Sequence, residues 1–343
     1  MAGHRPRYQR RQDRPGATSR HGDIYEQVNT RVLAALEAGT PPWQRPWPAA
    51  VGRPRSMSTG KPYQGVNIIL TGMTAIDRGY TSCWWGTRNQ INALGGHIRA
   101  GQNRAHGKGA TYITVWSERP ADADEGAEQA EGEETQIKVR VYASMRPVFN
   151  ADQCEGLPER FYPEPGAPVE EIAEPEAVLA AYDVSPGAAQ VLYDVHGAAY
   201  YDAAADQIHM PSRDNHTSAE RYYATGYHER THSTGHRSRL NRDTVGHGHK
   251  FGTPGYGREE LVAEMGTAYL CAATGIDTPA VTEQNAAYLQ SWITTIREDR
   301  KAVVNAASRA QKAADLILAP SRQAQHEPEP DPDRATATDI EAA

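Results

Sequence analysis

The sequence predicts an α+β protein built from two domains, and three observations lead to this prediction. The first half of the chain mixes short segments of helical periodicity with segments that alternate or run apolar like strands. Long segments of helical periodicity dominate the second half. A proline-rich stretch at 156–174 separates the halves, and 343 residues are enough for two domains of ordinary size.

The first half begins with a helix predicted over 24–38. Val28, Val32 and Leu36 fall on one face of this helix, and Gly39 is a natural stop. Shorter elements follow it. We expect helices at 68–78 and 87–94, and strands at 112–116 and 137–142.

The second half is predicted to be mostly helical. We expect a helix at 175–182, strands at 200–201 and 206–210, helices at 217–235 and 257–273, and an unusually long last helix at 281–316. These elements define five segments of the chain. They are a disordered basic arm (1–22), a first domain (23–155) with an acidic loop at about 118–135, a linker (156–174), a second domain (175–319) and a disordered acidic tail (320–343).

The composition excludes several classes of protein. No run of about 18 apolar residues is present, so we expect no membrane span. The Arg-rich N-terminus has no apolar stretch behind it, so we expect no secretory signal. The 3 cysteines are too few and too far apart for a disulfide framework or a cysteine-based zinc motif, which favours a cytoplasmic location.

Charge is distributed unevenly along the chain. The net charge of -7 argues weakly against nucleic-acid binding, and the mean hydropathy of -0.70 indicates much loop and tail. However, the basic residues are concentrated in 1–22 and 43–108, whereas the acids lie in 118–134, in 159–176 and in the tail. A local basic block can bind phosphate whatever the total charge is.

The second domain contains a metal-binding pattern. His228, Glu229 and His232 form His-Glu-x-x-His within the helix predicted at 217–235. Residues four apart lie on one helix face, so both imidazoles can reach one ion, and the Glu beside the first His can act as a general base. The pattern predicts a zincin-type site that holds one Zn²⁺ per chain or another divalent metal, with His228 and His232 as ligands and Glu229 as the catalytic base.

A third ligand is expected on the following helix. Glu260 and Glu264 lie four residues apart on an otherwise apolar helix, where carboxylates are costly unless they are paired or metal-bound. One should bind the ion, and the other should hold a ligand His by its second nitrogen. We favour Glu264 as the ligand because small residues follow it, with Glu260 as the alternative. His236 could bind only with different geometry.

Two further groups of polar residues are weaker candidates. The oxyanion of a reacting carbonyl needs a hydrogen-bond donor, and the sequence does not decide which residue after the helix supplies it. The candidates are Asn241, Arg242, His247, His249 and Tyr256. His209 lies at the end of a predicted strand and has an ordinary half-exposed position as its simplest interpretation.

Aromatic and basic residues interleave in the first domain. Such a mixture holds single-stranded nucleic acid by stacking bases on rings and placing phosphates near Arg or Lys. The candidate contacts are Trp43, Arg45, Trp47, Lys61, Tyr63, Trp84, Arg88, Arg99 and Lys108. The alternative is that most of the rings are core, because the segment is poor in Leu, Ile and Phe.

Several motifs resemble those of the ArdC-like antirestriction family of plasmids, phages and other mobile elements. The similar segments are LEAGTPPWQRPW (36–47), TGKPYQGVN (59–67), LGGHIR (94–99), VFNADQCEGL (148–157), HERTHSTGHRSRL (228–240) and EELVAE (259–264). The resemblance runs from about residue 24 to 318. It implies that 23–155 is a small α+β domain that binds single-stranded DNA. It also implies that 175–319 is a zincin-like metallopeptidase domain with a long C-terminal helix, and that the protein shields foreign DNA from host restriction.

Three hypotheses of function follow. The first is a single-stranded-DNA-binding antirestriction protein whose zinc metallopeptidase domain cleaves an unidentified protein substrate. The second is a DNA-covering protein with a purely structural metal and no peptidase activity. The third is a nuclease, which is disfavoured because the sequence has no Asp-rich two-metal cluster.

Overall fold

A computed structural model describes residues 24–43, 52–102, 109–120, 139–162, 175–245, 254–276 and 286–326. The helices of the first half are α1 (Ile24–Glu37), α2 (Val66–Arg78) and α3 (Arg88–Ala93). The helices of the second half are α4 (Pro175–Asp183), α5 (Ala219–Ser233), α6 (Pro254–Ala273), α7 (Ala286–Glu298) and α8 (Ala302–His326). No helix in these ranges is long and apolar enough to cross a membrane.

The described strands form three small sheets. One has the order β1-β2-β5-β4 and is built from β1 (Arg55–Ser56), β2 (Trp84–Gly86), β4 (Thr111–Pro120) and β5 (Val139–Asn150). The second pairs β3 (His97–Ile98) with β6 (Cys154–Glu155). The third, in the second half, has the order β7-β9-β8 and is built from β7 (Gln190–Leu192), β8 (Tyr200–Asp202) and β9 (Gln207–His209). Helices and strands therefore occur in both halves, and the chain is α+β.

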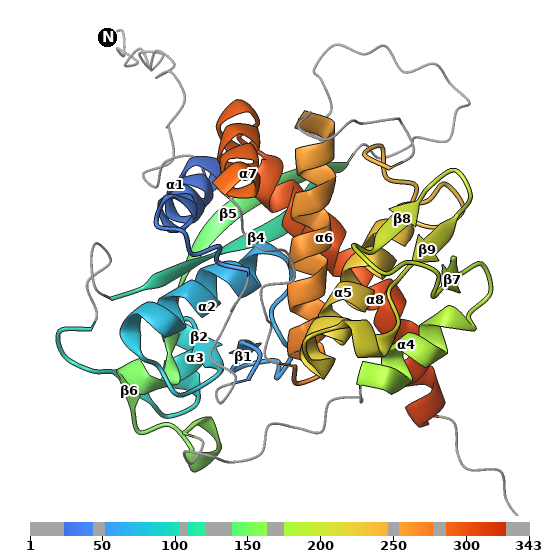
Figure 1. The fold of residues 1–343 in the computed structure, drawn as a ribbon. Coiled ribbons are helices and arrows are strands. Elements are labelled where there is room, and N and C mark those ends of the chain that lie inside the picture. Colours follow the sequence, from blue (N-terminus) through green and yellow to red (C-terminus); the bar gives the residue numbers. More distant parts are fainter. Residues whose placement is uncertain are drawn as a thin grey trace, which may run out of the picture.

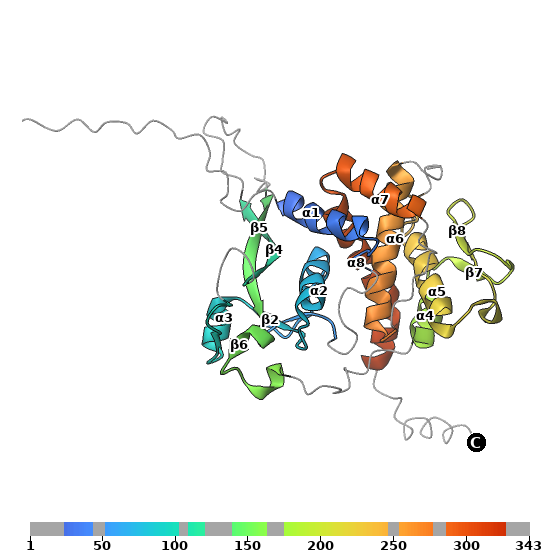
Figure 2. The same ribbon diagram turned by 60° about the vertical axis from the view of Figure 1, so that its left-hand side comes forward.

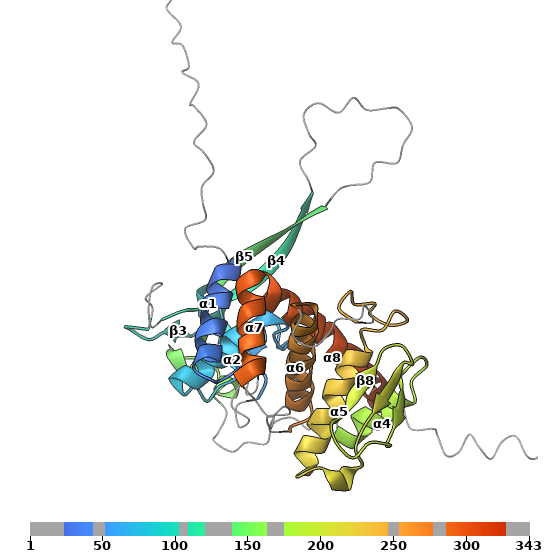
Figure 3. The ribbon, with the colours of Figure 1, turned by 45° about the horizontal axis from the view of Figure 1, so that its top comes forward.

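The elements are stacked in layers between the sheet that contains β4 and β5 and the sheet of β7 to β9 (Figures 1 and 2). α2 lies between the β4–β5 ribbon and the long helices α6 and α8, and α5 lies beyond α6 against the small sheet of β7 to β9. The β4–β5 ribbon extends away from the body of the protein (Figure 3). Of the acidic loop predicted at about 118–135, residues 118–120 belong to β4, and residues 121–135 lie outside the described residues.

The largest hydrophobic core joins the two halves of the chain. Val28 and Val32 of α1 and Ile68 of α2 are buried in the same cluster as Leu261 of α6 and Val303 of α8. Polar contacts cross the same boundary, since Tyr269 of α6 donates to the Gly65 carbonyl at 3.1 Å. The two halves therefore pack as one body, so a core substitution in α1 or α2 can disturb the helices that carry the second domain.

Most predicted elements are present within a few residues, but the strand predicted at 137–142 is observed as the longer β5, and the last helix also differs. The helix predicted over 281–316 is broken between α7 and α8, where the Asp299 carboxylate accepts the Lys301 amide at 2.9 Å and so begins a new helix. α8 then continues through Pro320 to His326, and Ser321 is buried. The prediction that the ordered domain ends at 319 is therefore wrong.

The boundary between the first domain and the linker also differs from the prediction. Leu157 and Phe161 are buried with Met57, Ile91 and Phe149 in a second core cluster. The first domain therefore includes residues to at least 161, because apolar side chains after 155 complete its core. The predicted disordered arm (1–22) and the tail from 327 onward lie outside the described residues.

Candidate metal centre

The helix α5 brings both histidines of the motif to one place. Its start is capped by Ser218, whose side chain accepts the Arg221 amide at 3.3 Å. His228 and His232 lie one turn apart, and their Nε2 atoms are 3.1 Å from each other. Both rings are largely buried. The short separation shows that the predicted helical spacing brings the two imidazoles together.

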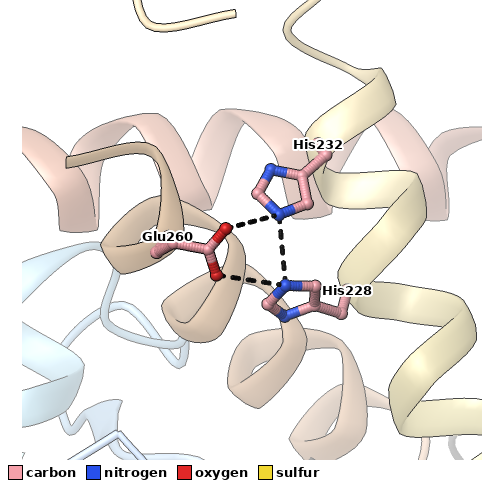
Figure 4. Close-up of side chains that lie close together, drawn as sticks. All are labelled: His228, His232 and Glu260. Carbon is pink, nitrogen blue, oxygen red and sulfur yellow. Dashed lines mark hydrogen bonds and ion pairs between the residues drawn. The ribbon is translucent and has the colours of Figure 1, made fainter. Parts of the chain in front are cut away.

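Glu260 of α6 completes the group. Its Oε2 is 3.6 Å from His228 Nε2, and its Oε1 is 3.5 Å from His232 Nε2 (Figure 4). Among the described residues, these three are the ones whose possible ligand atoms all lie within 4.8 Å of one another. The structure places the alternative, Glu260, beside both Nε2 atoms, whereas the favoured Glu264 lies on the Nδ1 side of His228, so Glu260 is the better-placed candidate for the third ligand.

The separations within this group fit a single ion. A tetrahedral metal about 2.0–2.1 Å from each ligand requires ligand atoms roughly 3.3–3.4 Å apart. The observed separations of 3.1, 3.5 and 3.6 Å bracket that value. Two imidazoles and one carboxylate are also a ligand set common at catalytic zinc sites. The residues present therefore fit a divalent metal.

The crossing of α5 and α6 explains why Glu260 is placed at the ion site. The helices touch at Gly266, where an added Cβ would lie 2.6 Å from Thr231 Cγ2. Small residues after Glu264 do mark this close approach, as the sequence indicated. However, Glu264 lies so close to this contact that its carboxylate is near Nδ1 of His228 and not near Nε2. Glu264 Oε1 is 4.0 Å from His228 Nδ1, whereas Glu260, one turn earlier, reaches the Nε2 tips.

Glu229 lies beside the ligands and is buried. Burial is the main cause that raises the pKa of the Glu229 carboxyl above its ordinary value. A cleft of about 1140 Å³ opens over the group, and Glu229, both histidines and Glu260 line it. Segment 197–204, which includes β8, forms another wall. A general base needs a carboxylate that lies beside the candidate metal ligands and lines a cleft open to substrate, and Glu229 has this position.

The weaker candidates fall in different places. Arg242 is buried and bonded to Glu259, so it does not point at a reacting carbonyl. Tyr256 lines the cleft and stays a candidate oxyanion donor. His209 is held by the Asp194 carboxylate at 2.9 Å and stacks on Tyr200, away from the metal group. His247 and His249 lie outside the described residues.

Arg230, which follows Glu229 within the His-Glu-x-x-His motif, has a structural role. Arg230 is almost fully buried, and its guanidinium pairs with Asp183 of α4. Its Nη1 also donates to the Gly226 carbonyl at 3.0 Å. A Cβ on Gly226 would lie 3.1 Å from that Nη1, so the glycine provides the space that the guanidinium occupies. Arg230 thereby ties the ligand helix to α4.

We expect metal uptake to release protons at neutral pH. Burial lowers the pKa of both imidazoles, but the nearby carboxylate of Glu260, and for His232 also that of Glu259, raises it by more. Both histidines therefore hold protons above their ordinary range, and a metal must displace them. The apparent affinity should rise as the pH is raised through and beyond about 6.5. Calorimetric titration in buffers of different ionisation enthalpy measures the protons released, and an affinity independent of pH between about 6 and 8 contradicts this.

The residues predicted to contact nucleic acid divide into buried and exposed groups. Trp43 is fully buried and packs edge-on against Trp292 of α7, with ring centroids 5.4 Å apart. Trp43 is therefore a core residue, and its assignment as a base-stacking residue was wrong. Tyr63 packs against the core, and Trp84 is half-buried against Phe161 at 5.3 Å.

The exposed group consists of cations. Lys61 and Arg88 are exposed, and Gln90 of α3 donates to Ser58 in the turn before Lys61, which joins the segments that carry them. Arg99 is also exposed and contacts Glu155 at 3.3 Å. Arg45, Trp47 and Lys108 lie outside the described residues. Lys61, Arg88 and Arg99 are thus the predicted contacts that the structure leaves accessible.

Replacement of Trp43 by alanine is expected to destabilise the protein rather than to weaken DNA binding directly. Loss of a fully buried indole should lower the free energy of unfolding by about 3–5 kcal/mol. Urea unfolding measures this loss, and DNA affinity is measured below the onset of unfolding. If stability is unchanged while DNA affinity falls, Trp43 contacts DNA after all.

Two family models match the chain. A zincin-like metallopeptidase domain matches residues 184–309, and the N-terminal domain of the anti-restriction factor ArdC matches residues 22–149. The first covers the metal group, and the second covers the exposed cations described above.

Two similar proteins differ greatly in length. A Sinorhizobium fredii protein, y4eC, is 32% identical over 307 residues, which are 88% of this chain and 94% of that protein. The DNA primase TraC of Escherichia coli is 37% identical over 308 residues, which are 86% of this chain. This chain spans only 27% of the length of that primase.

Solved structures of one plasmid protein are also similar. The metal-free crystal structure of the antirestriction protein ArdC from plasmid R388 has a TM-score of 0.69 and 35% sequence identity, and the match covers 88% of this chain and 98% of that one. The Mn(II)-bound structure of the same protein has a TM-score of 0.66 and 35% identity, and the match covers 87% and 98% of the chains. The similarity therefore extends over both halves of the fold.

Proposed function

The chain belongs to the ArdC-like antirestriction family, and from this premise we propose that it is a DNA-binding antirestriction protein with a metal-dependent peptidase centre. In this proposal the first domain holds single-stranded DNA of an incoming mobile element, and the second cleaves a protein present at that DNA. The observation that carries the peptidase part is the group of His228, His232 and Glu260 beside Glu229 in an open cleft.

The geometry favours a catalytic metal over a structural one. Structural zinc sites are usually closed by four protein ligands, whereas catalytic sites keep one position open. Among the residues that the structure describes, three candidate ligands converge, and they line a cleft of about 1140 Å³ that a peptide segment can enter. The zincin-like model and the Mn(II)-bound relative support a divalent metal at this position, and we propose zinc.

The residues of the site have distinct roles in the proposed reaction. A divalent ion bound there would supply Lewis acidity toward a peptide carbonyl and toward water. Glu229 accepts the proton of the attacking water and returns it to the leaving amine. Glu229 lines the cleft beside the candidate ligands, and burial raises the pKa of its carboxyl. Tyr256 is placed at the cleft to donate to the developing oxyanion.

We propose that DNA binding depends mainly on the exposed cations of the first domain. Lys61, Arg88 and Arg99 lie on the segment that matches the ArdC N-terminal model. Phosphate contacts by such residues are sequence-independent and release counterions, so binding should weaken steeply with salt. Trp84 keeps part of its ring accessible and stays a candidate for stacking on a base.

The experiment that tests this function measures both activities on one preparation. Purified full-length protein is titrated with fluorescent single-stranded and double-stranded oligonucleotides across a salt series, and is then incubated with unfolded casein with and without zinc. Salt-sensitive preference for single strands together with zinc-dependent cleavage supports the proposal. Binding without cleavage under any metal leaves the DNA-covering alternative, and cutting of the oligonucleotide itself points to a nuclease.

A further inference from the structure

The loop after α5 is tied to the metal group through one buried guanidinium. Arg242 donates through Nη2 to the Thr231 carbonyl at 2.7 Å and to the His232 carbonyl at 3.2 Å, both in the last turn of the ligand helix. Its Nη1 donates to Thr234 Oγ1 at 2.7 Å. These contacts satisfy backbone carbonyls that the helix end leaves without intrahelical partners.

The same guanidinium holds a carboxylate of the next helix. Arg242 Nη2 is 2.5 Å from Glu259 Oε1, and its Nε is 3.1 Å from Glu259 Oε2, so the pair is forked. The Thr244 hydroxyl also donates to Glu259 Oε2. The Glu259 carboxylate is therefore held by a guanidinium and a hydroxyl of the same loop.

Glu259 contacts the metal ligand on the side away from the ion position. Its Oε1 is 3.3 Å from His232 Nδ1, while His232 Nε2 faces Glu260 and His228. A carboxylate on one ring nitrogen fixes the tautomer and the direction of the other nitrogen. We propose that Glu259 and Arg242 act as a positioning pair that presents His232 Nε2 to the metal and sets the metal affinity of the site. This inference rests on the proposed metal centre.

A glycine shows how closely the pair is fitted. A Cβ on Gly235 would lie 2.7 Å from Arg242 Nη2, 2.8 Å from its Cζ and 2.4 Å from Val245 Cγ2. Such contacts are too short for any real Cβ, so a side chain at 235 would displace the guanidinium. Gly235 is therefore present for close packing against Arg242, and it does not have a positive φ.

The other histidine is held less firmly, which gives the proposal an internal comparison. His228 Nδ1 is buried and has no hydrogen-bond partner among the described residues. The carboxylate near it is Glu264, at 4.0 Å, beyond hydrogen-bond distance. Glu259 should therefore matter more than Glu264 for the direction of a ligand, although both are buried carboxylates of α6.

The test compares Glu259→Gln and Arg242→Gln with Arg239→Gln as the matched control. Arg239 belongs to the same loop and also donates to a carbonyl at the end of α5, Ser233 O at 2.7 Å. However, its carboxylate partner is Asp206, not Glu259. Each full-length variant is unfolded in urea without metal, titrated with Zn²⁺ against a chelator of known affinity, and loaded with Co²⁺ for its visible absorption spectrum.

We expect Glu259→Gln and Arg242→Gln to lower Zn²⁺ affinity about 10- to 100-fold and to change the Co²⁺ spectrum. Arg239→Gln should lower the urea midpoint with neither effect. The double variant should bind zinc about as weakly as either single variant, because the two residues act as a unit. If the wild type binds zinc and both single variants bind it equally well, the pair is only structural and the inference is wrong. If the wild type itself binds no divalent metal, the proposed metal centre fails with it.

Discussion

Substitution of Glu260 by alanine is expected to leave the purified protein without bound metal, whereas Glu264→Ala should remain loaded. Glu260 places one oxygen near each histidine Nε2, so its loss removes one of three converging candidate ligands and leaves no carboxylate beside the two Nε2 atoms. Glu264 lies on the Nδ1 side of His228 at 4.0 Å. Its loss should reduce affinity by no more than about tenfold, the lower end for an outer partner of a ligand.

Metal content after dialysis, measured by atomic emission, distinguishes the two variants. About one zinc per chain is expected for the wild type and for Glu264→Ala, and close to none for Glu260→Ala. Circular dichroism of the metal-free proteins controls for folding, since each substitution removes a buried carboxylate of the same helix. The opposite pattern, with metal kept in Glu260→Ala and lost in Glu264→Ala, would restore the assignment made from the sequence.

The sequence could identify two of the three candidate ligand positions because helical periodicity determines them. His228 and His232 are four residues apart, so any α-helix places them on one face. The same periodicity puts Glu260 and Glu264 on one face of α6, which is why the sequence could not choose between them. The choice depends on where α5 and α6 cross, and that contact, Gly266 against Thr231, is a tertiary feature.

The positioning pair was missed for a related reason. Glu259 entered the sequence analysis only as part of the segment EELVAE (259–264), beside the two carboxylates considered as ligands. Arg242 was noticed only as a possible oxyanion donor. Its real partner became clear from the path of the loop after α5, which returns Arg242 to the helix end. The periodicity of apolar residues predicts helices and strands, but it does not predict the path of a loop between them.

The nucleic-acid contacts show the limit of composition as a guide. Aromatic residues interleaved with bases are expected both in a stacking surface and in a core that is short of Leu, Ile and Phe. Trp43 follows α1 and is buried because α1 packs against α7, an element more than 240 residues further along the chain. The exposure of Lys61, Arg88 and Arg99 was easier to predict because such side chains are costly to bury, and their contact with nucleic acid stays a prediction.

Substitution of Glu229 by glutamine is expected to reduce peptide hydrolysis by about 100- to 10,000-fold, the usual contribution of a general base. Glutamine has nearly the same shape and keeps a hydrogen-bonding oxygen, but it cannot accept the proton of the attacking water. The ligands and the first domain are untouched, so metal content and DNA affinity should equal those of the wild type. Glu220→Gln, at an exposed position in the first turn of the same helix, is the matched control for casein cleavage.

The same variant decides whether the two activities serve one purpose. Restriction of an incoming plasmid is compared in cells that express wild type, Glu229→Gln, or Lys61→Glu with Arg88→Glu, which removes exposed positive charge from the first domain. If protection survives Glu229→Gln and is lost with the charge reversals, covering of DNA is sufficient and the peptidase centre serves another step. If both variants lose protection, cleavage of a DNA-bound protein is part of antirestriction. In that case the shared core, which packs the two halves of the chain together, would hold the peptidase centre close to the DNA that carries its substrate.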